Sequence, residues 1–226
     1  MTQPVDTISP LAVIMLRFVR AAALVAAPDW KDTCEAVYPS LFYLRKDAIL
    51  VSGFFVSAGG VGLTVNHFWE QVKGEMEGAT LHHNGQVYQF KVLARSPQKD
   101  VMVVQPRATH SFPYLRLRPV SLDLGDQVCA FGTNLGLIHC FVPGFILDPT
   151  YSLMKSVTFP CIRSSCRAEA GYSGGPLTLP SGEVVGIHKA ETQLFPKVND
   201  SAAIPIKEAI EVLKTVAKET ESGWER

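Results

Sequence analysis

From residue 37 onward the chain is a succession of short apolar runs, and this feature most constrains its fold. The runs are rich in Val, Ile and Phe and are separated by Gly, Pro, Asn and Ser. Examples are AILVSGFFVS, GVGLTV, QVYQFKVLA, DVMVVQP, QVCAFGTN and EVVGIHKA. Runs of about four to eight such residues are typical of the strands of a sandwich or barrel. We therefore predict an all-β fold.

The residues between these runs predict two hairpin turns. Asn84-Gly85 follows His83, and the Asn-Gly pair favours a two-residue type I′ hairpin. Pro180, Ser181 and Gly182 separate PLTL from EVVGI in the same way. Both turns predict antiparallel neighbours.

The chain divides into two predicted β units, residues 37–110 and 120–205. The linker between them, residues 111–119, contains two prolines and two arginines. A helical extension is expected over residues 1–36, where Ser9-Pro10 resembles an N-cap followed by a proline at the first helical position. A helix and tail are expected over residues 206–226. There the apolar residues recur at helical spacing: Ile206, Ala209, Ile210, Leu213 and Val216.

The charge balance argues against a nucleic-acid partner. The chain has 21 Lys and Arg against 21 Asp and Glu, so its formal net charge is zero. Binding to a phosphate backbone depends on a positive surface that releases counterions. Proteins or peptides are the expected partners, and the sequence gives no prediction of the oligomeric state.

The apolar stretch 11–27 near the amino terminus is interrupted by Arg17 and Arg20. A membrane span needs about 20 predominantly apolar residues, so we expect a surface or packing helix and no membrane association. The stretch from Thr7 to Pro28 contains arginines and no acidic residue, which leaves import into an organelle as an alternative.

The five cysteines, an odd number, do not suggest a disulfide framework. Only Cys161 and Cys166 are close enough in sequence to suggest a bridge, and we expect thiols in a reducing compartment. We therefore predict an intracellular, cytoplasmic location. Because the Cys and His residues lack zinc-site spacing, no metal or other cofactor is expected.

The segment Gly171-Tyr172-Ser173-Gly174-Gly175-Pro176-Leu177 carries the strongest chemical signal. A serine hydroxyl is a weak nucleophile that needs a neighbouring base, and its attack on a carbonyl creates an oxyanion that needs donors. Glycines let the backbone turn tightly enough for the N–H groups of Gly171 and Ser173 to point at one spot. The alternative is an ordinary glycine turn between strands.

Partners for this serine are present. His67 follows the strand-like segment GLTVN and has a side chain that can accept a proton near neutral pH. Asp100 precedes the apolar run VMVV, where a carboxylate can accept the Nδ1 proton of His67 and fix its tautomer. Asp123 and Asp126 compete for that role, but they lie in a turn-like segment entering the second unit.

SGFFVSAGGVGLTVNHF, KDVMVVQP, GYSGGPL and GEVVGIHKA together resemble the sequence blocks of trypsin-like serine peptidases. VSLDLGDQVCAFGTNLGL and AAIPIKEAIEVL resemble, more narrowly, the protease domain of HtrA/Deg enzymes. The resemblance implies a chymotrypsin-like fold of two six-stranded antiparallel β-barrels, flanked here by the two helices. It also implies a triad of His67, Asp100 and Ser173 with the oxyanion hole at Gly171 and Ser173.

Gly186-Ile187-His188 resembles the GIH motif of glutamyl endopeptidases and picornavirus-type main proteases. In those families the histidine contacts a Glu or Gln at P1, the residue on the acyl side of the cleaved bond. The resemblance assigns substrate binding to His188. Ala168 is expected in the pocket wall, at a position where those families often carry Ser or Thr, and Arg167 and Lys189 are candidates for added positive charge. The alternative for His188 is a strand residue that bonds backbone beside the cleft.

The sequence thus predicts a serine endopeptidase that works through an acyl-enzyme, with a preference for Glu or Gln at P1. Processing of a viral polyprotein is a variant of this prediction. A catalytically silent protease-like module that binds peptides or scaffolds an assembly is the alternative from another class. A third possibility is a module that associates with a membrane or partner through its amino-terminal apolar helix.

Overall fold

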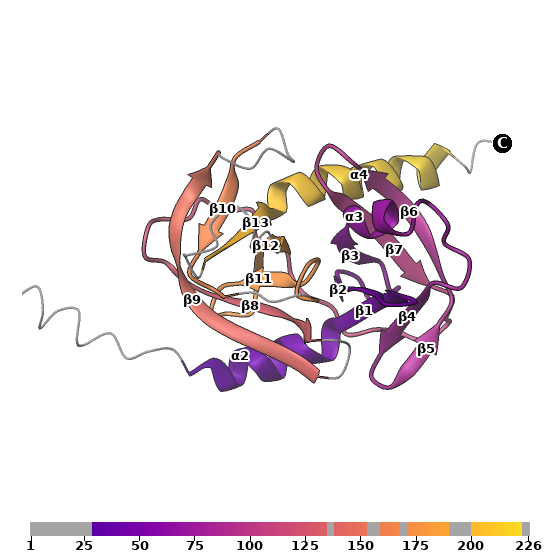
Figure 1. Ribbon diagram of the computed structural model, residues 1–226, viewed down its shortest axis with the longest axis horizontal. Coiled ribbons are helices and arrows are strands. Elements are labelled where there is room, and N and C mark those ends of the chain that lie inside the picture. Colours follow the sequence, from indigo (N-terminus) through magenta and orange to yellow (C-terminus); the bar gives the residue numbers. More distant parts are fainter. Residues whose placement is uncertain (1–28, 135–137, 153–158, 168–170, 190–199, 223–226) are drawn as a thin grey trace, which may run out of the picture.

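The structure is a computed structural model that describes residues 29–134, 138–152, 159–167, 171–189 and 200–222. The predicted extension over residues 1–36 therefore lies outside the described residues up to position 28. Figure 1 shows two β units side by side, with helix α4 crossing both of them and helix α2 on the opposite side.

The first unit is a seven-stranded antiparallel sheet in the order β5-β4-β1-β2-β3-β7-β6. Its strands are β1 (Leu41–Lys46), β2 (Ile49–Phe55), β3 (Gly62–Val65), β4 (Thr80–His83), β5 (Gln86–Tyr88), β6 (Phe90–Ser96) and β7 (Val101–Pro106). The edge strands β5 and β6 are separated in the chain only by Gln89. The sheet must therefore curve until its two edges approach each other.

The second unit is a closed barrel in the order β10-β13-β12-β11-β8-β9. Its strands are β8 (Gln127–Asn134), β9 (Ile138–Tyr151), β10 (Cys161–Ser164), β11 (Pro176–Thr178), β12 (Val184–Lys189) and β13 (Ser201–Pro205). All pairings in the barrel are antiparallel.

The predicted hairpin at Asn84-Gly85 is confirmed. His83 pairs with Gln86 across it, and both turn residues have positive φ, 47° for Asn84 and 75° for Gly85. That combination is what a type I′ turn requires.

The expected two-barrel architecture is confirmed, with six strands in the closed barrel of the second unit and seven in the curved sheet of the first. The first unit has a seventh strand because the run that reads QVYQFKVLA divides at Gln89 into β5 and β6. These two strands belong to opposite edges of the sheet, β5 beside β4 and β6 beside β7.

Backbone bonds tie residues 111–119 first to one unit and then to the other. Leu115 N–H donates to the Phe55 carbonyl of β2 at 2.9 Å. Arg118 N–H then donates to the Val184 carbonyl of β12 at 2.8 Å. The segment predicted to be a linker therefore fixes β2 and β12 relative to each other.

Helices close the two ends of this arrangement. α2 (Trp30–Val37) begins after Asp29, whose carboxylate accepts from the Lys31 N–H at 3.0 Å, and is followed by the 3-10 turn η1 (Tyr38–Ser40). α3 (His67–Gln71) is a short helix directly after β3. α4 (Ile206–Ser222) buries Ile206, Ala209 and Val212 against both units. Within the described ranges, none of these helices has both the length and the hydrophobicity to cross a bilayer.

One apolar core runs between the two units and holds them together. Its buried members come from the sheet, for example Phe54 and Leu63, and from the barrel, for example Phe131 and Ile187. The barrel interior adds a second cluster that includes Val128 and Leu177. Residues at the junction of the units are therefore held by packing from both sides.

Candidate active site

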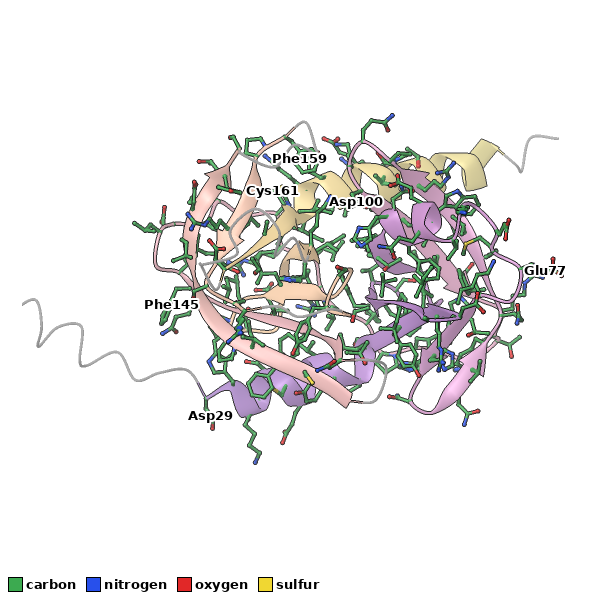
Figure 2. All side chains as sticks on the ribbon, viewed as in Figure 1. Asp29, Glu77, Asp100, Phe145, Phe159 and Cys161 are labelled. Carbon is green, nitrogen blue, oxygen red and sulfur yellow. The ribbon has the colours of Figure 1, made fainter. Side chains whose placement is uncertain are left out.

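The strand pairing of the sheet brings a histidine and an aspartate together. β3 and β7 are antiparallel, and Val65 lies opposite Val101. The chain therefore leaves β3 at the edge where it enters β7, so His67 and Asp100 become neighbours. The Asn66 N–H donates to the Asp100 carbonyl at 3.1 Å and holds the two loops in register. Figure 2 shows Asp100 between the two units.

Asp100 binds His67 through both carboxylate oxygens. Oδ1 accepts from the His67 backbone N–H at 2.7 Å, and Oδ2 lies 2.9 Å from Nδ1 of the ring. Since a carboxylate only accepts, this contact requires the ring hydrogen on Nδ1. Nε2 then carries the lone pair and is the nitrogen able to take a proton. The His67 side chain is 22% exposed, whereas that of Asp100 is 6% exposed.

The backbone at Asp100 adopts a left-handed conformation with φ of 53°. This region is uncommon for residues with a side chain, although Asp tolerates it better than most. The turn is fixed by Asp100 N–H, which donates to the Pro97 carbonyl at 3.2 Å. It directs the carboxylate back over the start of α3.

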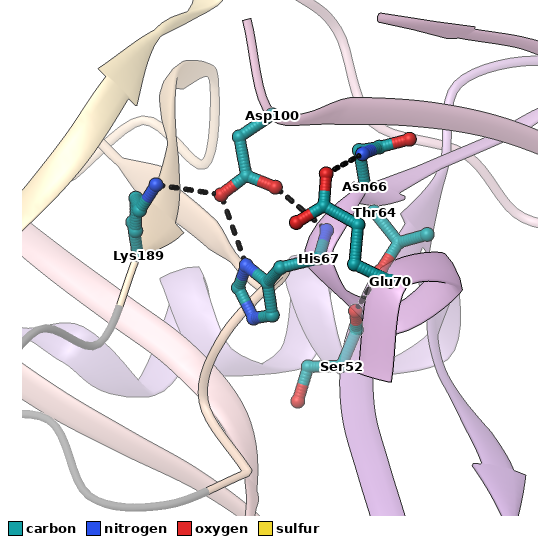
Figure 3. Close-up of polar contacts among 7 residues, drawn as sticks. All are labelled: Ser52, Thr64, Asn66, His67, Glu70, Asp100 and Lys189. Atoms are coloured by element: carbon teal, nitrogen blue, oxygen red, sulfur yellow. Dashed lines mark hydrogen bonds and ion pairs between the residues drawn. The ribbon is translucent and has the colours of Figure 1, made fainter. Parts of the chain in front are cut away.

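A lysine from the barrel completes the surroundings of Asp100. Lys189, the last residue of β12, places Nζ 2.8 Å from Oδ2, and its side chain is only 7% exposed. Figure 3 shows the carboxylate between His67 and Lys189. Burial by itself raises the pKa of Asp100, but the bond from His67 and the charges of both partners outweigh it and hold that pKa below its ordinary value. Asp100 is therefore a carboxylate at neutral pH.

The sequence assigned Lys189 to substrate binding and gave no indication of this contact. The signal that could have found it is strand alternation, because neighbouring residues of a strand point to opposite faces. If His188 faces one side of β12, Lys189 must face the other. In the structure the Lys189 side chain contacts the Asp100 carboxylate on that other side.

Ser173 lies in a loop that bonds to both units. Its carbonyl accepts from the Ser52 N–H of β2 at 2.8 Å. The next residue, Gly174, donates its N–H to the His188 carbonyl of β12, also at 2.8 Å. Ser173 is 8% exposed. The loop is thus fixed at the junction between β2 and β12.

The glycines after the serine are required by close backbone packing. A Cβ on Gly174 would lie 2.1 Å from the Ser52 carbonyl oxygen and 2.5 Å from Thr64 Oγ1, and its φ is 90°. Thr64 is three residues before His67, so this loop lies directly against the segment that leads to the histidine. A Cβ on Gly175 would lie 1.9 Å from the Phe131 carbonyl oxygen.

Ser52 organises the peptide before Tyr172, and the sequence did not point to it. Its hydroxyl donates to the Gly171 carbonyl at 2.6 Å and accepts from the Thr133 N–H at 2.9 Å. Gly171 has φ of 100°, which favours glycine. The orientation of the Gly171–Tyr172 peptide is therefore fixed by a side chain of β2.

His188 is completely buried behind the serine loop. Within the described residues neither ring nitrogen has a hydrogen-bond partner, and the ring packs edge-on against Tyr172 with centroids 6.2 Å apart. Burial lowers the pKa of His188 to about 4. The ring is therefore a neutral imidazole with unused hydrogen-bonding capacity.

The remaining candidates are placed as follows. Arg167 is exposed, and Ala168 lies outside the described residues. Asp123 and Asp126 form a turn of their own at the entry to β8, in which Asp126 Oδ2 accepts from the Asp123 N–H at 2.8 Å. Among the described residues, no three His, Cys, Asp or Glu side chains gather as a metal site.

Comparison with known families gives one match that contains all three predicted triad residues. Residues 51–187 match the family model described as a trypsin-like peptidase domain. A crystal structure of the serine endoprotease from Yersinia pestis superposes with a TM-score of 0.72 at 21% identity, covering 86% of this chain and 69% of that one. The likeness confirms the predicted chymotrypsin-like fold class.

Curated relatives carry the same domain in a longer protein. A probable periplasmic serine endoprotease, DegP-like, from Pseudomonas putida is 30% identical over 187 residues, which is 80% of this chain and 38% of that protein. A relative of the same description from Chlamydia trachomatis is 31% identical over 148 residues, which is 65% and 29% respectively. The chain therefore spans well under half the length of these relatives.

The predicted cytoplasmic location is wrong, because these relatives are named periplasmic enzymes. The prediction used the cysteines, and the structure shows why they do not report the compartment. All five are thiols, and four of them, Cys34, Cys129, Cys161 and Cys166, are buried. Burial keeps a thiol from oxidants in any compartment, so the absence of disulfides does not indicate reducing surroundings.

Proposed function

Because this chain belongs to the trypsin-like peptidase family, we propose that it is a serine endopeptidase with Ser173 as nucleophile, His67 as general base and Asp100 as orienting carboxylate. The observation that carries the proposal is the pair of bonds that Asp100 accepts from His67, from the backbone N–H at 2.7 Å and from Nδ1 at 2.9 Å. The Nδ1 bond holds the imidazole in the one tautomer that can take a proton from a serine hydroxyl.

The reaction proceeds in two halves. Ser173 Oγ attacks the carbonyl carbon of the substrate peptide as His67 Nε2 takes the hydroxyl proton, and a tetrahedral oxyanion forms. When this intermediate collapses, the C–N bond breaks and the leaving amine takes the proton from His67. Water then attacks the acyl-enzyme with the same histidine as base, releasing the acid product and restoring Ser173. Asp100 stays ionised throughout and stabilises the imidazolium.

The backbone N–H groups of Gly171 and Ser173 form the oxyanion hole in this proposal. Support comes from the Tyr172–Ser173 peptide, which carries the Ser173 N–H and whose Tyr172 carbonyl is fixed by the Gly175 N–H at 2.9 Å. Donors that are already oriented need no rearrangement as charge develops on the substrate oxygen, and such preorganisation is a large part of catalysis.

For substrate preference we propose Glu or Gln at P1, bound by His188. The support is a buried, neutral imidazole behind the serine loop whose ring nitrogens have no hydrogen-bond partner among the described residues. A side-chain carbonyl or carboxylate oxygen at P1 would accept from its N–H, and exposed Arg167 would favour the carboxylate. Lys189 is left out of this set because its ammonium binds Asp100.

The P1 proposal is tested with a fluorogenic peptide library varied at P1 on wild type and His188→Ala. A bond to the ionised Glu carboxylate, about 1.5–3 kcal/mol, predicts a loss of roughly one to two decades in kcat/KM for Glu substrates, and a neutral bond to Gln, about 0.5–1.5 kcal/mol, predicts a loss of roughly two- to tenfold. Small apolar P1 residues should be spared. Best cleavage after Lys or Arg would refute the preference, and equal loss at all P1 residues would assign His188 to packing alone.

The endopeptidase proposal itself is tested by hydrolysis of denatured casein. Ser173→Ala should abolish turnover, since loss of one triad member costs on the order of 10⁴ to 10⁶ in kcat. The matched control is Ser181→Ala, in an exposed turn between β11 and β12, which should keep full activity. A folded wild type that cleaves neither casein nor any library peptide would favour a catalytically silent peptide-binding module.

A further inference from the structure

Asp100 is shared by two cationic or basic groups from opposite units. His67 comes from the sheet, at the start of α3, and Lys189 comes from the barrel, at the end of β12. Both contact the same oxygen, Oδ2, at 2.9 and 2.8 Å. The Lys189 and Asp100 side chains are nearly equally buried, 7% and 6% exposed, so water screens this pair poorly.

We propose that Lys189 is a positioning residue that holds the Asp100 carboxylate from the opposite unit and extends peptide hydrolysis to more acidic pH than a neutral donor there would allow. The inference rests on the proposed function, because it concerns the base of that reaction. It adds a role for a side chain that the three-residue triad does not include.

The net charge of the buried cluster of His67, Asp100 and Lys189 depends on whether the donor at position 189 is charged or neutral. With a neutral donor beside it, the Asp100 carboxylate would be balanced only when His67 takes up a proton. Lys189 already balances it, so protonating His67 leaves the cluster with a net positive charge. Because both nitrogens contact one oxygen, the two cations would lie within about 6 Å of each other, a separation at which like charges shift a titration by about one to three pH units.

Other charged groups near Asp100 have partners of their own. Glu70 on α3 accepts from Asn66 Nδ2 at 2.8 Å. Lys99, which precedes Asp100, turns away and pairs with Glu208 and Glu211 on α4. Within the part of the chain that the structure describes, the charges in direct contact with the Asp100 carboxylate are therefore those of His67 and Lys189.

The test compares three substitutions at one position in the full chain. Lys189→Met keeps the length of the side chain without its charge, Lys189→Ser supplies a short neutral hydroxyl, and Lys189→Arg keeps the charge. The titration of the His67 ring is followed by NMR, with the His67 signal assigned from a His67→Gln variant. The pH profile of kcat/KM is measured on one peptide substrate that the wild type cleaves.

In both neutral variants the His67 midpoint and the acid limb of the profile should move up by about one pH unit, and in Lys189→Arg neither should move. Lower activity with an unchanged limb in the neutral variants would overturn the proposal, because it would mean a purely structural role. Failure of both neutral variants to fold, judged by circular dichroism, would also overturn the proposal, because Lys189 would then be needed for the structure itself.

The NMR titration does not depend on turnover, so the two proposals can fail separately. A wild type without peptidase activity whose His67 midpoint still shifts in Lys189→Met would refute the endopeptidase and keep the electrostatic role of Lys189. If the wild type is active but the His67 midpoints of wild type and Lys189→Met agree within about 0.2 pH unit, only the electrostatic role of Lys189 is refuted.

Discussion

Replacing Asp100 by asparagine should destabilise the fold as well as abolish catalysis, because the buried Lys189 ammonium would lose its counter-charge. The two side chains are 6% and 7% exposed and their charged atoms lie 2.8 Å apart. Removing one partner of a buried ion pair costs about 3–5 kcal/mol, since the remaining charge loses that attraction while it stays shielded from water. That is a large share of a total stability of about 5–15 kcal/mol.

The assay is equilibrium unfolding in urea at pH 7. With a slope of about 2–3 kcal/mol per molar, Asp100→Asn should lower the midpoint by roughly 1–2 M. Adding Lys189→Met to Asp100→Asn removes the buried positive charge as well and should restore a good part of that loss. The control is Glu183→Gln, which breaks an exposed contact with Arg118 and should leave the midpoint unchanged.

Two results would contradict a dependence of the Lys189 charge on Asp100. One is an Asp100→Asn midpoint as close to wild type as that of Glu183→Gln. The other is a double variant that is less stable than Asp100→Asn alone. Either would mean that the Lys189 ammonium finds water or another partner once the carboxylate is gone, so that its charge does not depend on Asp100 for stabilisation.

Three further predictions concern the same region. Gly174→Ala should abolish activity and lower stability, since its Cβ would lie 2.1 Å from the Ser52 carbonyl oxygen; normal activity would refute the loop geometry. Iodoacetamide should leave peptidase activity intact, because burial raises the pKa of Cys129 and Cys166 and disfavours their thiolates; rapid inactivation with Ser173 unmodified would contradict this. The depressed pKa of Asp100 adds stability that is present above its ordinary value of 3.8 and is lost as pH falls through the lower folded-state value, so urea midpoints of the wild type should fall over that acidic range more steeply than those of Asp100→Asn.

The sequence predicted the β fold and the His67–Asp100 proximity for physical reasons. Alternating short apolar runs favour strands, and a histidine after one strand meets an aspartate before another when those strands pair antiparallel, as β3 and β7 do. The glycines around Ser173 were a usable signal in the sequence because only glycine fits the close backbone contacts that the loop makes.

The features that the sequence did not predict arise from contacts between segments that lie far apart in the chain. Nothing local to QVYQFKVLA shows that its halves join opposite edges of one sheet, so the seventh strand was missed. Lys189 was assigned to the substrate side because it adjoins His188 in the chain, although adjacent residues of a strand face opposite ways. Ser52 gave no signal at all, since its role arises from Gly171 and Thr133, which lie far away in sequence.

Covalent labelling with a fluorophosphonate, followed by mass spectrometry of the intact chain and its peptides, tests whether His67 and Asp100 activate Ser173. We expect one label per wild-type chain, located on Ser173, no label on Ser173→Ala, and labelling slowed by several orders of magnitude in His67→Ala. Equal labelling rates in wild type and His67→Ala, or a label on any other residue, would contradict this activation.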